Sequence, residues 1–323
     1  MSITQINLET GLTTELARDA TRPLSPAREG TAGGIVWLDI PAPSEDDLAW
    51  LAREYDFHPL ALEDCRHFDQ RAKVDAYDSY LFLSVHAVTR ANGDLRAQEL
   101  QVFLSADYLI TAHREPIAAL DAMRMRCTSD SRTGNYRADM LLYQITDQMV
   151  DAIFPLLDTI EDDIDELEDE ILDKPTQESL HQVFTLKRQL VFLRKTVGPM
   201  RDAMDVLADT RYEFIDPHTA LYYRDTYDHL VRIYDLIETS RDLLGNALDA
   251  YLSTVSNRLN EVIKRLTLIT TIFMPISFVV GFGGMNFTQY IPFDNPLAFG
   301  ILIALLVAMP TMMVVWFWRS KWM

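Results

Sequence analysis

Residues 246–287 read NALDAYLSTVSNRLNEVIKRLTLITTIFMPISFVVGFGGMNF, and this stretch decides the fold because two patterns meet in it. Its first half, with the residues just before it, repeats apolar side chains at steps of four and three, which is typical of a helix that packs lengthwise against similar helices. The repeat comprises Leu244, Leu248, Leu252, Val255, Leu259, Val262 and Leu266. An unbroken helix over 219–283 would be about 95 Å long at about 1.5 Å per residue, which suits the stalk of a symmetric oligomer.

The second half of the stretch, residues 266–283, has no charged side chain and is long enough to cross the hydrocarbon core of a membrane. Residues 297–318 form a second segment of this kind. Basic residues flank the pair only on its outer sides, at Lys264, Arg265, Arg319 and Lys321. By the positive-inside rule, we predict a protein of the cell inner membrane whose two termini are cytoplasmic and whose short connecting loop faces out.

The chain has 323 residues with 48 acidic and 29 basic side chains, a formal net charge of −19. This excess argues against a nucleic-acid partner, because phosphate binding needs clustered Lys and Arg, and it is compatible with attraction of cations. The two cysteines, Cys65 and Cys127, form no CxxC pattern, so a reducing compartment is expected for the main domain. The sequence contains no P-loop, HExxH or nucleophile-elbow pattern, so an enzyme is not expected.

The N-terminal part is predicted to be a small cytoplasmic α/β domain over 34–135, preceded by a flexible arm over 1–33. Its first run, GIVWLDI, is a plausible strand, and Ser44 is placed to cap a helix over 43–55. HPLALEDC then indicates a short helix. Two β-rich runs follow, KVDAYDSYLFLSVHAVT and ELQVFLSADYLITAHR, separated by the turn signal ANGD.

Residues 136–218 are predicted to be cytoplasmic acidic helices. The densest run, DTIEDDIDELEDEILD at 158–173, places its apolar side chains at helical spacing. The carboxylates of this run could attract cations, but a solvated helix face is the more common reason for such a run. The remaining segments are expected to be a stalk helix over 219–265, a pore-lining span over 266–283, an outer loop over 284–296, a second span over 297–318 and a basic cytoplasmic tail over 319–323.

One face of the first span differs from a surface that would face lipid. At steps of three and four it presents Leu266, Thr270, Met274, Ser277 and Gly281. The outer half of this face is small or weakly polar, whereas a lipid-facing stripe would consist of Leu, Ile, Phe and Val. Two explanations are open at this point: close packing between membrane helices, or a narrow pore lined by hydroxyls and a thioether.

Gly284, Met285 and Asn286 follow at the outer end of this face, and they favour the pore. In a ring of copies, Asn286 would present amide oxygens that hydrogen-bond the water shell of a cation without removing it. This arrangement suits Mg²⁺, which dehydrates reluctantly, and rings of oxygen atoms are a known source of selectivity in channels. The glycines would allow close backbone approach and a tight turn.

The stretch 246–287, with its Gly-Met-Asn signature, strongly resembles the last stalk and pore segment of the CorA family of magnesium transporters. The order of the other segments agrees with that family from about residue 34 onward. The resemblance implies a homopentamer in a lipid membrane, with a funnel-shaped cytoplasmic α/β domain, a long helical stalk and two transmembrane helices. It further implies that Gly284 and Asn286 form an outer ion-selectivity site, and that Met274 and Leu266 form a hydrophobic constriction in the pore.

The resemblance also implies regulation by cytoplasmic divalent cations, which in the family hold the pentamer closed. Asp249 on the stalk would be a metal ligand, and its partner would be Glu63 or Asp64 of a neighbouring copy. Paired carboxylates across an interface repel one another unless a hard cation bridges them. Divalent ions would then be both substrate and regulator, and no separate cofactor is expected.

Two departures from the family pattern leave the transported ion open among Mg²⁺, Zn²⁺, Co²⁺ and Ni²⁺. Gly283 occupies a position that is usually aromatic, and Asp294 is the only acid in the outer loop FTQYIPFDNP. The zinc-transporting branch of the family also varies near this loop, but the spans and loop lack the Cys and His ligands that Zn²⁺ prefers, which favours Mg²⁺. A membrane-anchored metal sensor that does not conduct is a further alternative.

Overall fold

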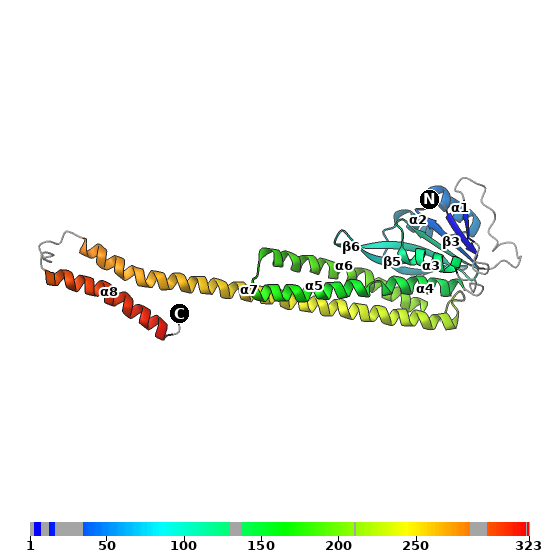
Figure 1. Cartoon of the computed structure of the whole chain (residues 1–323). Helices are drawn as coiled ribbons and strands as arrows, with labels where there is room; N and C mark the ends of the chain where they lie inside the picture. Colours follow the sequence, from blue (N-terminus) through cyan, green and yellow to red (C-terminus); the bar gives the residue numbers. More distant parts are fainter. Residues whose placement is uncertain are drawn as a thin grey trace. The chain divides into compact units, whose positions relative to one another are not determined.

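The computed structural model describes residues 3–7, 13–16, 35–129, 137–209, 211–284, 296–320 and 322 (Figure 1). Its strands are β1 (Ile3–Asn7), β2 (Thr13–Leu16), β3 (Val36–Pro41), β4 (Lys73–Ala76), β5 (Leu81–Ala91), β6 (Asp94–Leu104) and β7 (Tyr108–His113). Its helices are α1 (Glu45–Tyr55), α2 (Pro59–His67), α3 (Ala118–Ser129), α4 (Ala138–Asp151), α5 (Phe154–Asp173), α6 (Gln177–Leu207), α7 (Pro217–Gly283) and α8 (Pro296–Arg319).

Internal contacts divide the chain into two units. The first consists of Met1–Glu170 and Gln177–Ala247, and it contains the β-sheet. The second consists of Ile171–Thr176 and Leu248–Met323, and it contains the last part of α7 and all of α8. Because α7 is a continuous helix of 67 residues, it belongs to both units, and it confirms the long helix expected from the sequence.

The sheet of the first unit has seven strands in the order β2-β1-β3-β7-β6-β5-β4, and only β3 and β7 are parallel. Strand β1 and the edge strand β2 lie in the segment 1–33, for which a flexible arm was expected, so that prediction is wrong for these two strands. The reason is visible in β1, which pairs with β3 and thereby satisfies its backbone groups. Its Ile6 is completely buried and its Thr4 is only 6% exposed.

The longest ladder is the hairpin of β5 and β6, which pair along their whole length from Leu81 with Leu104 to Ala91 with Asp94. Asn92 and Gly93 form its turn with φ angles of 54° and 89°. Two successive positive φ angles are what a tight type I′ hairpin turn requires, and the Asn-Gly pair adopts them most easily. The turn expected at ANGD is therefore confirmed.

Helices cover both faces of the sheet (Figure 1). On one face α1 and α2 enclose an aromatic core, in which the Phe57 and Phe103 rings stack with their centroids 4.0 Å apart. Tyr80 joins this core, and its hydroxyl accepts a hydrogen bond of 2.9 Å from the backbone N–H of His58. On the other face α4 contacts β5, β6 and β7, and α6 contacts β4, β5 and β6. The expected α/β domain is thus an antiparallel-rich sheet between two helical layers.

The starts of α1 and α2 follow the sequence signals. Ser44 forms a capping box with Asp47: the Ser44 hydroxyl accepts from the Asp47 N–H at 3.2 Å, and the Asp47 carboxylate accepts from the Ser44 N–H at 2.8 Å. His58 caps α2 by accepting from the Leu60 N–H through its Nδ1 atom, and Pro59 follows at the first helical position. Both helix starts agree with the sequence analysis.

A buried polar group links β3 and β7. The Asp39 carboxylate is 2% exposed and accepts a hydrogen bond of 2.7 Å from the Thr111 hydroxyl, which in turn accepts from the Trp37 indole at 3.0 Å. His113 Nε2 lies 3.3 Å from Asp39 Oδ1. Burial alone would lower the pKa of His113, but the Asp39 carboxylate and the Glu115 backbone carbonyl outweigh it, so the pKa is raised.

Helix α5 separates apolar from acidic side chains. Ile160, Ile164 and Leu167 are buried, while most of the carboxylates face solvent, so within the described chain the acidic run is a solvated helix face. Leu172, which shares the apolar spacing in the sequence, is 66% exposed. In α7, Tyr223 is completely buried and donates a hydrogen bond of 3.0 Å to the backbone carbonyl of Asp139 on α4.

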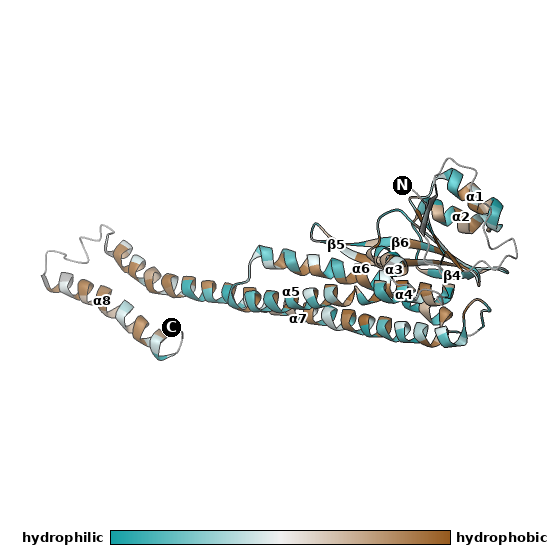
Figure 2. Ribbon diagram, turned by 45° about the vertical axis from the view of Figure 1, so that its right-hand side comes forward, coloured by the Kyte–Doolittle hydropathy of each residue, from teal (hydrophilic) through white to brown (hydrophobic). Residues whose placement is uncertain are grey.

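The last turns of α7 and much of α8 are brown in Figure 2, so these two segments are mainly apolar. Two helical segments, Pro217–Phe282 and Gly300–Arg319, contain a window long and apolar enough to cross a membrane, and only 6% of each window is buried. A core helix of a soluble protein would be mostly buried instead. Each segment contains one proline within its apolar part, Pro275 in α7 and Pro310 in α8.

Candidate functional site

The five expected pore-lining residues form one row along the last part of α7. Spacings of three and four residues bring successive side chains onto the same face of an α-helix. Leu266 and Met274 are 63% and 65% exposed, and Thr270, Ser277 and Gly281 are also exposed. The whole row is therefore open to a surface outside the single chain, which both helix packing between copies and a pore would require.

The hydroxyl of Thr270 adds a hydrogen-bond acceptor to this row. It donates a hydrogen bond of 2.9 Å to the backbone carbonyl of Leu266, one turn earlier. Because the hydroxyl has only one proton, the oxygen then offers lone pairs to its surroundings. Thr267, which does not belong to the row, bonds to Ile263 in the same way at 2.8 Å. An outward-facing oxygen acceptor is compatible with contact to the water shell of a cation.

Glycines end the row. No atom lies within 4 Å of the place where a Cβ atom would stand on Gly281, so this position leaves an open gap beside the helix. Gly284 closes the helix by donating its N–H to the Val280 carbonyl at 2.9 Å, and a Cβ atom there would lie 3.4 Å from the same oxygen. Met285 and Asn286 lie outside the described residues, so their role in ion selectivity stays a prediction.

The apolar repeat that precedes the span is also uncovered. Leu244 is 2% exposed, but Leu252, Val255, Leu259 and Val262 are 58%, 40%, 58% and 57% exposed. Water-exposed apolar side chains at regular spacing mark a surface for another protein or another copy of the chain. Since these residues precede the first span, the surface continues the row of pore-lining candidates along the same helix.

The three carboxylates expected to bind a regulatory metal lie in different units. Glu63 and Asp64 are neighbours on α2 in the first unit, and Asp249 is an exposed residue in the second. Asp64 already has a cationic partner, because the Lys73 ammonium lies 2.8 Å from its Oδ2 atom. Lys73 is also 2.8 Å from Asp75. Glu63 is exposed, so its carboxylate is the more accessible of the two on α2.

A second group of side chains that could hold a metal ion, which no sequence pattern indicated, consists of Asp147 and Asp151 on α4 and His229 on α7. The i, i+4 spacing of the two aspartates is visible in the sequence and places them on one face of a helix. The histidine comes from a different helix, 78 positions further along, and no local pattern connects it to the aspartates. Only the packing of α4 against α7 brings the three together.

Comparison with known proteins covers almost the whole chain. Residues 32–319 match the family model described as CorA-like Mg²⁺ transporter protein. The cobalt/magnesium transport protein CorA of Thermotoga maritima is 36% identical over 292 residues, which cover 89% of this chain and 83% of that protein. The zinc transport protein ZntB of Yersinia enterocolitica is more distant, with 22% identity over 304 residues that cover 93% of this chain and 91% of that one.

The fold has a close structural counterpart. The complete structure of the CorA magnesium transporter from Methanocaldococcus jannaschii superimposes with a TM-score of 0.85, covering 100% of this chain and 99% of that one at 21% identity. Because the sequence identity is low, the match shows only a shared fold, which includes the long helix and the two apolar segments. The family follows from the sequence matches, and together these observations show that the chain belongs to the CorA family of membrane ion transporters.

Proposed function

We propose that the protein is a divalent-cation channel that passes Mg²⁺ across the inner membrane without coupling to an energy source. The observation that carries this proposal is the row from Leu266 to Gly281, which is small or weakly polar in its outer half and entirely exposed in the single chain. The Gly-Met-Asn signature at 284–286 stands at the end of this row. An enzyme is not proposed, since the family consists of transporters.

Passive entry is sufficient on energetic grounds. An inside-negative membrane potential favours the entry of one elementary charge by about 2.3 kcal/mol per 100 mV, so it favours a dication by about 4.6 kcal/mol. The acceptor oxygen of Thr270 and the amide of Asn286 would contact the ion through its water shell, because Mg²⁺ gives up its waters reluctantly. Leu266 and Met274 would form the apolar constriction that closes the path.

The assembly that fits this pore is a homopentamer with both termini in the cytoplasm. Its support is the uncovered apolar surface of Leu252, Val255, Leu259 and Val262, which further copies of the same helix would bury. The basic residues at the two outer flanks of the span pair support the placement of both termini. The transported ions would then pass along the symmetry axis, between the α7 helices of neighbouring copies.

Regulation by cytoplasmic Mg²⁺ would use Asp249 of one copy and a carboxylate on α2 of the next. Glu63 is exposed, whereas Asp64 would have to exchange its Lys73 partner at 2.8 Å for the metal. This difference favours Glu63 as the direct ligand. Asp249→Ala is therefore expected to remove the protection against proteolysis that millimolar Mg²⁺ gives the wild type, and Glu63→Gln is expected to weaken it more than Asp64→Asn does.

Zinc transport is the second candidate, and one observation favours it: the outer loop contains a single acid, Asp294, where an acidic ring would otherwise concentrate Mg²⁺. Against it stands the absence of Cys and His from the sequence of the spans and loop. The same acid-poor loop is the reason to consider a metal sensor that does not conduct. Flux measurements separate the three functions.

The experiment is ion flux into proteoliposomes, with Mg²⁺ and Zn²⁺ in parallel, for the wild type and Asn286→Ala. Asn257→Ala, the same substitution on the exposed stalk, is the matched control. We expect Mg²⁺ flux in the wild type and the control and none in Asn286→Ala. Zn²⁺ flux without Mg²⁺ flux would assign the chain to zinc transport, and no flux of either ion would refute conduction and favour the sensor.

A further inference from the structure

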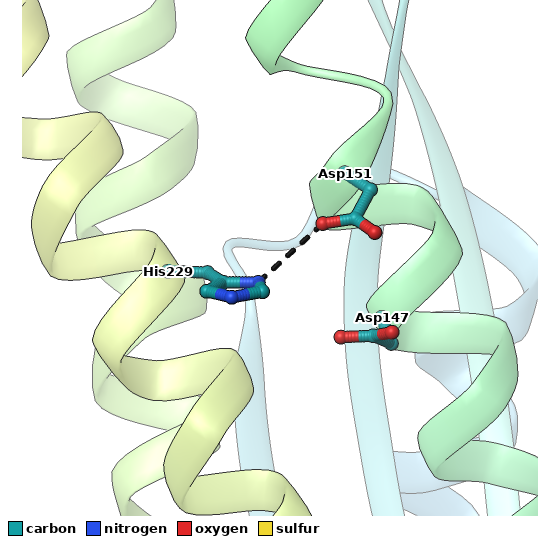
Figure 3. Close-up of side chains that lie close together, drawn as sticks. All are labelled: Asp147, Asp151 and His229. Atoms are coloured by element: carbon teal, nitrogen blue, oxygen red, sulfur yellow. Dashed lines mark ion pairs between the residues drawn. The ribbon is translucent and has the colours of Figure 1, made fainter.

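Three metal-ligating side chains meet in the first unit, far along the chain from the span and its signature. Asp147 and Asp151 lie one turn apart on α4, and His229 reaches them from α7 (Figure 3). One ligand atom of each residue lies within 4.8 Å of the other two. Elsewhere in the described part of the chain, His, Cys, Asp and Glu form no other group of this kind. The arrangement combines a ring nitrogen with two carboxylates from two different helices.

The spacing of His229 and Asp151 fits a small tetrahedral ion. His229 Nδ1 and Asp151 Oδ1 are 3.4 Å apart, the pair joined by the dashed line in Figure 3. Two ligand atoms that each lie about 2.1 Å from a tetrahedral zinc ion are about 3.4 Å from one another. Asp147 faces the same space from the turn before Asp151. A fourth position would be left for water or for another carboxylate.

The same contact is a poor hydrogen bond. An N–H···O bond has its donor and acceptor about 2.7 to 3.2 Å apart, and the His229–Asp151 pair is longer than this. His229 Nδ1 is shielded from solvent, and it makes no hydrogen bond with any other described atom. Buried polar atoms normally have a bonding partner. A metal ion held between this ring nitrogen and the two carboxylates would supply the missing one.

Neighbouring side chains hold the ligands in place, as the outer partners of metal sites do. The Thr226 hydroxyl lies 3.2 Å from Asp147 Oδ1, within reach to donate a hydrogen bond. Asp225, one turn earlier on α7, has its Oδ2 atom 3.9 Å from His229 Nε2. In the tautomer with its proton on Nε2, the imidazole would offer the lone pair of Nδ1 to a metal. Phe154 packs against the ring edge-on, with the centroids 6.1 Å apart.

The two negative charges of the group also favour the binding of a cation. Within the described residues, no lysine or arginine forms an ion pair with Asp147 or Asp151. A bound dication would relieve the repulsion between the two carboxylates.

We propose that Asp147, Asp151 and His229 form a binding site for a transition-metal dication of the Zn²⁺ or Co²⁺ type, which joins α4 to α7. An imidazole nitrogen with two carboxylate oxygens is a ligand set that Zn²⁺, Co²⁺ and Ni²⁺ accept, whereas Mg²⁺ prefers oxygen ligands only. The site is independent of the proposed pore, because none of its residues belongs to the spans or to the regulatory carboxylates. It would allow the protein to respond to a metal other than the one it transports.

The test is Co²⁺ binding to the full-length protein in detergent, after removal of metals with a chelator and in the presence of millimolar Mg²⁺. Cobalt bound to nitrogen and oxygen ligands absorbs visible light, so the spectrum reports the ligand set. The variants are His229→Gln and Asp151→Asn, and His218→Gln, an exposed histidine on the same helix, is the matched control. Circular dichroism checks that each variant is folded.

We expect one Co²⁺ per chain that Mg²⁺ does not displace and that Zn²⁺ does. Loss of a second-shell partner typically weakens metal binding about 10- to 100-fold, so removal of His229 or Asp151 is expected to weaken it by at least that factor. The control should bind as the wild type does. Wild-type protein without a Mg²⁺-resistant cobalt band, or a folded His229→Gln variant with unchanged affinity and spectrum, would overturn the proposal. Mg²⁺ flux is measured separately, so failure of one proposal leaves the other standing.

Discussion

Leu259→Ser should weaken the assembly of the protein without unfolding the individual chain. Leu259 belongs to the apolar repeat on α7 and is 58% exposed in the single chain, so its side chain contributes little to the packing within one copy. Complete burial of a leucine side chain is worth about 1.5 to 3 kcal/mol. Covering the exposed 58% in an interface is then worth about 1 to 1.7 kcal/mol per copy.

The serine hydroxyl adds a further cost. Burial of a hydroxyl without a hydrogen-bond partner costs about 1 to 3 kcal/mol in proteins, so the substitution is expected to destabilise the interface by about 2 to 5 kcal/mol per copy. In a ring of identical copies this penalty is repeated in every copy. At a fixed protein concentration in detergent, the variant should dissociate under conditions in which the wild type stays assembled.

The assay is size-exclusion chromatography with light scattering over a dilution series, combined with circular dichroism of the dissociated chain. Leu221→Ser is the matched control, because Leu221 lies on the same helix, is 66% exposed and is outside the repeat. Leu259→Ser should dissociate at a higher concentration than the control does, with its helix content retained. Equal dissociation of the two variants would refute the assignment of this face to the interface between copies.

Three further predictions concern the first unit, and urea unfolding of the detergent-solubilised protein measures each of them. Ser44→Ala removes the side-chain cap of α1 and should lower the unfolding free energy by about 1 kcal/mol, while Ser44→Gly should lower it by only a few tenths; equal effects of the two would rule out the capping role. Tyr223→Phe removes the buried hydrogen bond to the Asp139 carbonyl and should cost about 1 to 3 kcal/mol, so an unchanged stability would show that water replaces the hydroxyl. Because the Asp39 carboxylate raises the pKa of His113, the contribution of this pair is fully present below the unfolded-state value of about 6.5 and is lost as the pH rises through the higher folded-state pKa. The stability difference between the wild type and His113→Gln should therefore shrink as the pH rises above about 6.5, and a difference that grows with pH would contradict this account.

Local signals in the sequence predicted much of the fold. The cap at Ser44, the turn at Asn92 and Gly93 and the long helix of α7 all depend on a few neighbouring residues, and each formed where its chemistry indicated. Strands β1 and β2 were missed because short polar segments have no strong strand signal of their own. They are strands because β3 offers an unpaired edge to β1, and β1 then offers one to β2, which is a property of the folded sheet.

In the candidate functional site, too, local features could be predicted from the sequence and contacts between distant elements could not. The spacing from Leu266 to Gly281 predicted a common face of α7, because a single helix determines it. The ion pair between Asp64 and Lys73, and the meeting of His229 with Asp147 and Asp151, depend on contacts between different elements. Sequence spacing contains no information about such contacts, so residues of this kind could be recognised only in the folded chain.

Pro275 limits the ways in which the first span can face the bilayer. A proline has no backbone N–H, so the carbonyl of Thr271, one turn earlier, loses the donor it would have in a regular helix. In hydrocarbon a carbonyl without a hydrogen bond costs several kcal/mol, and lipid tails cannot supply the missing donor. This turn of α7 is therefore most stable where water or a neighbouring helix reaches it, and a polar solute could coordinate the freed oxygen there. The requirement favours rotations of the helix that turn this carbonyl away from lipid.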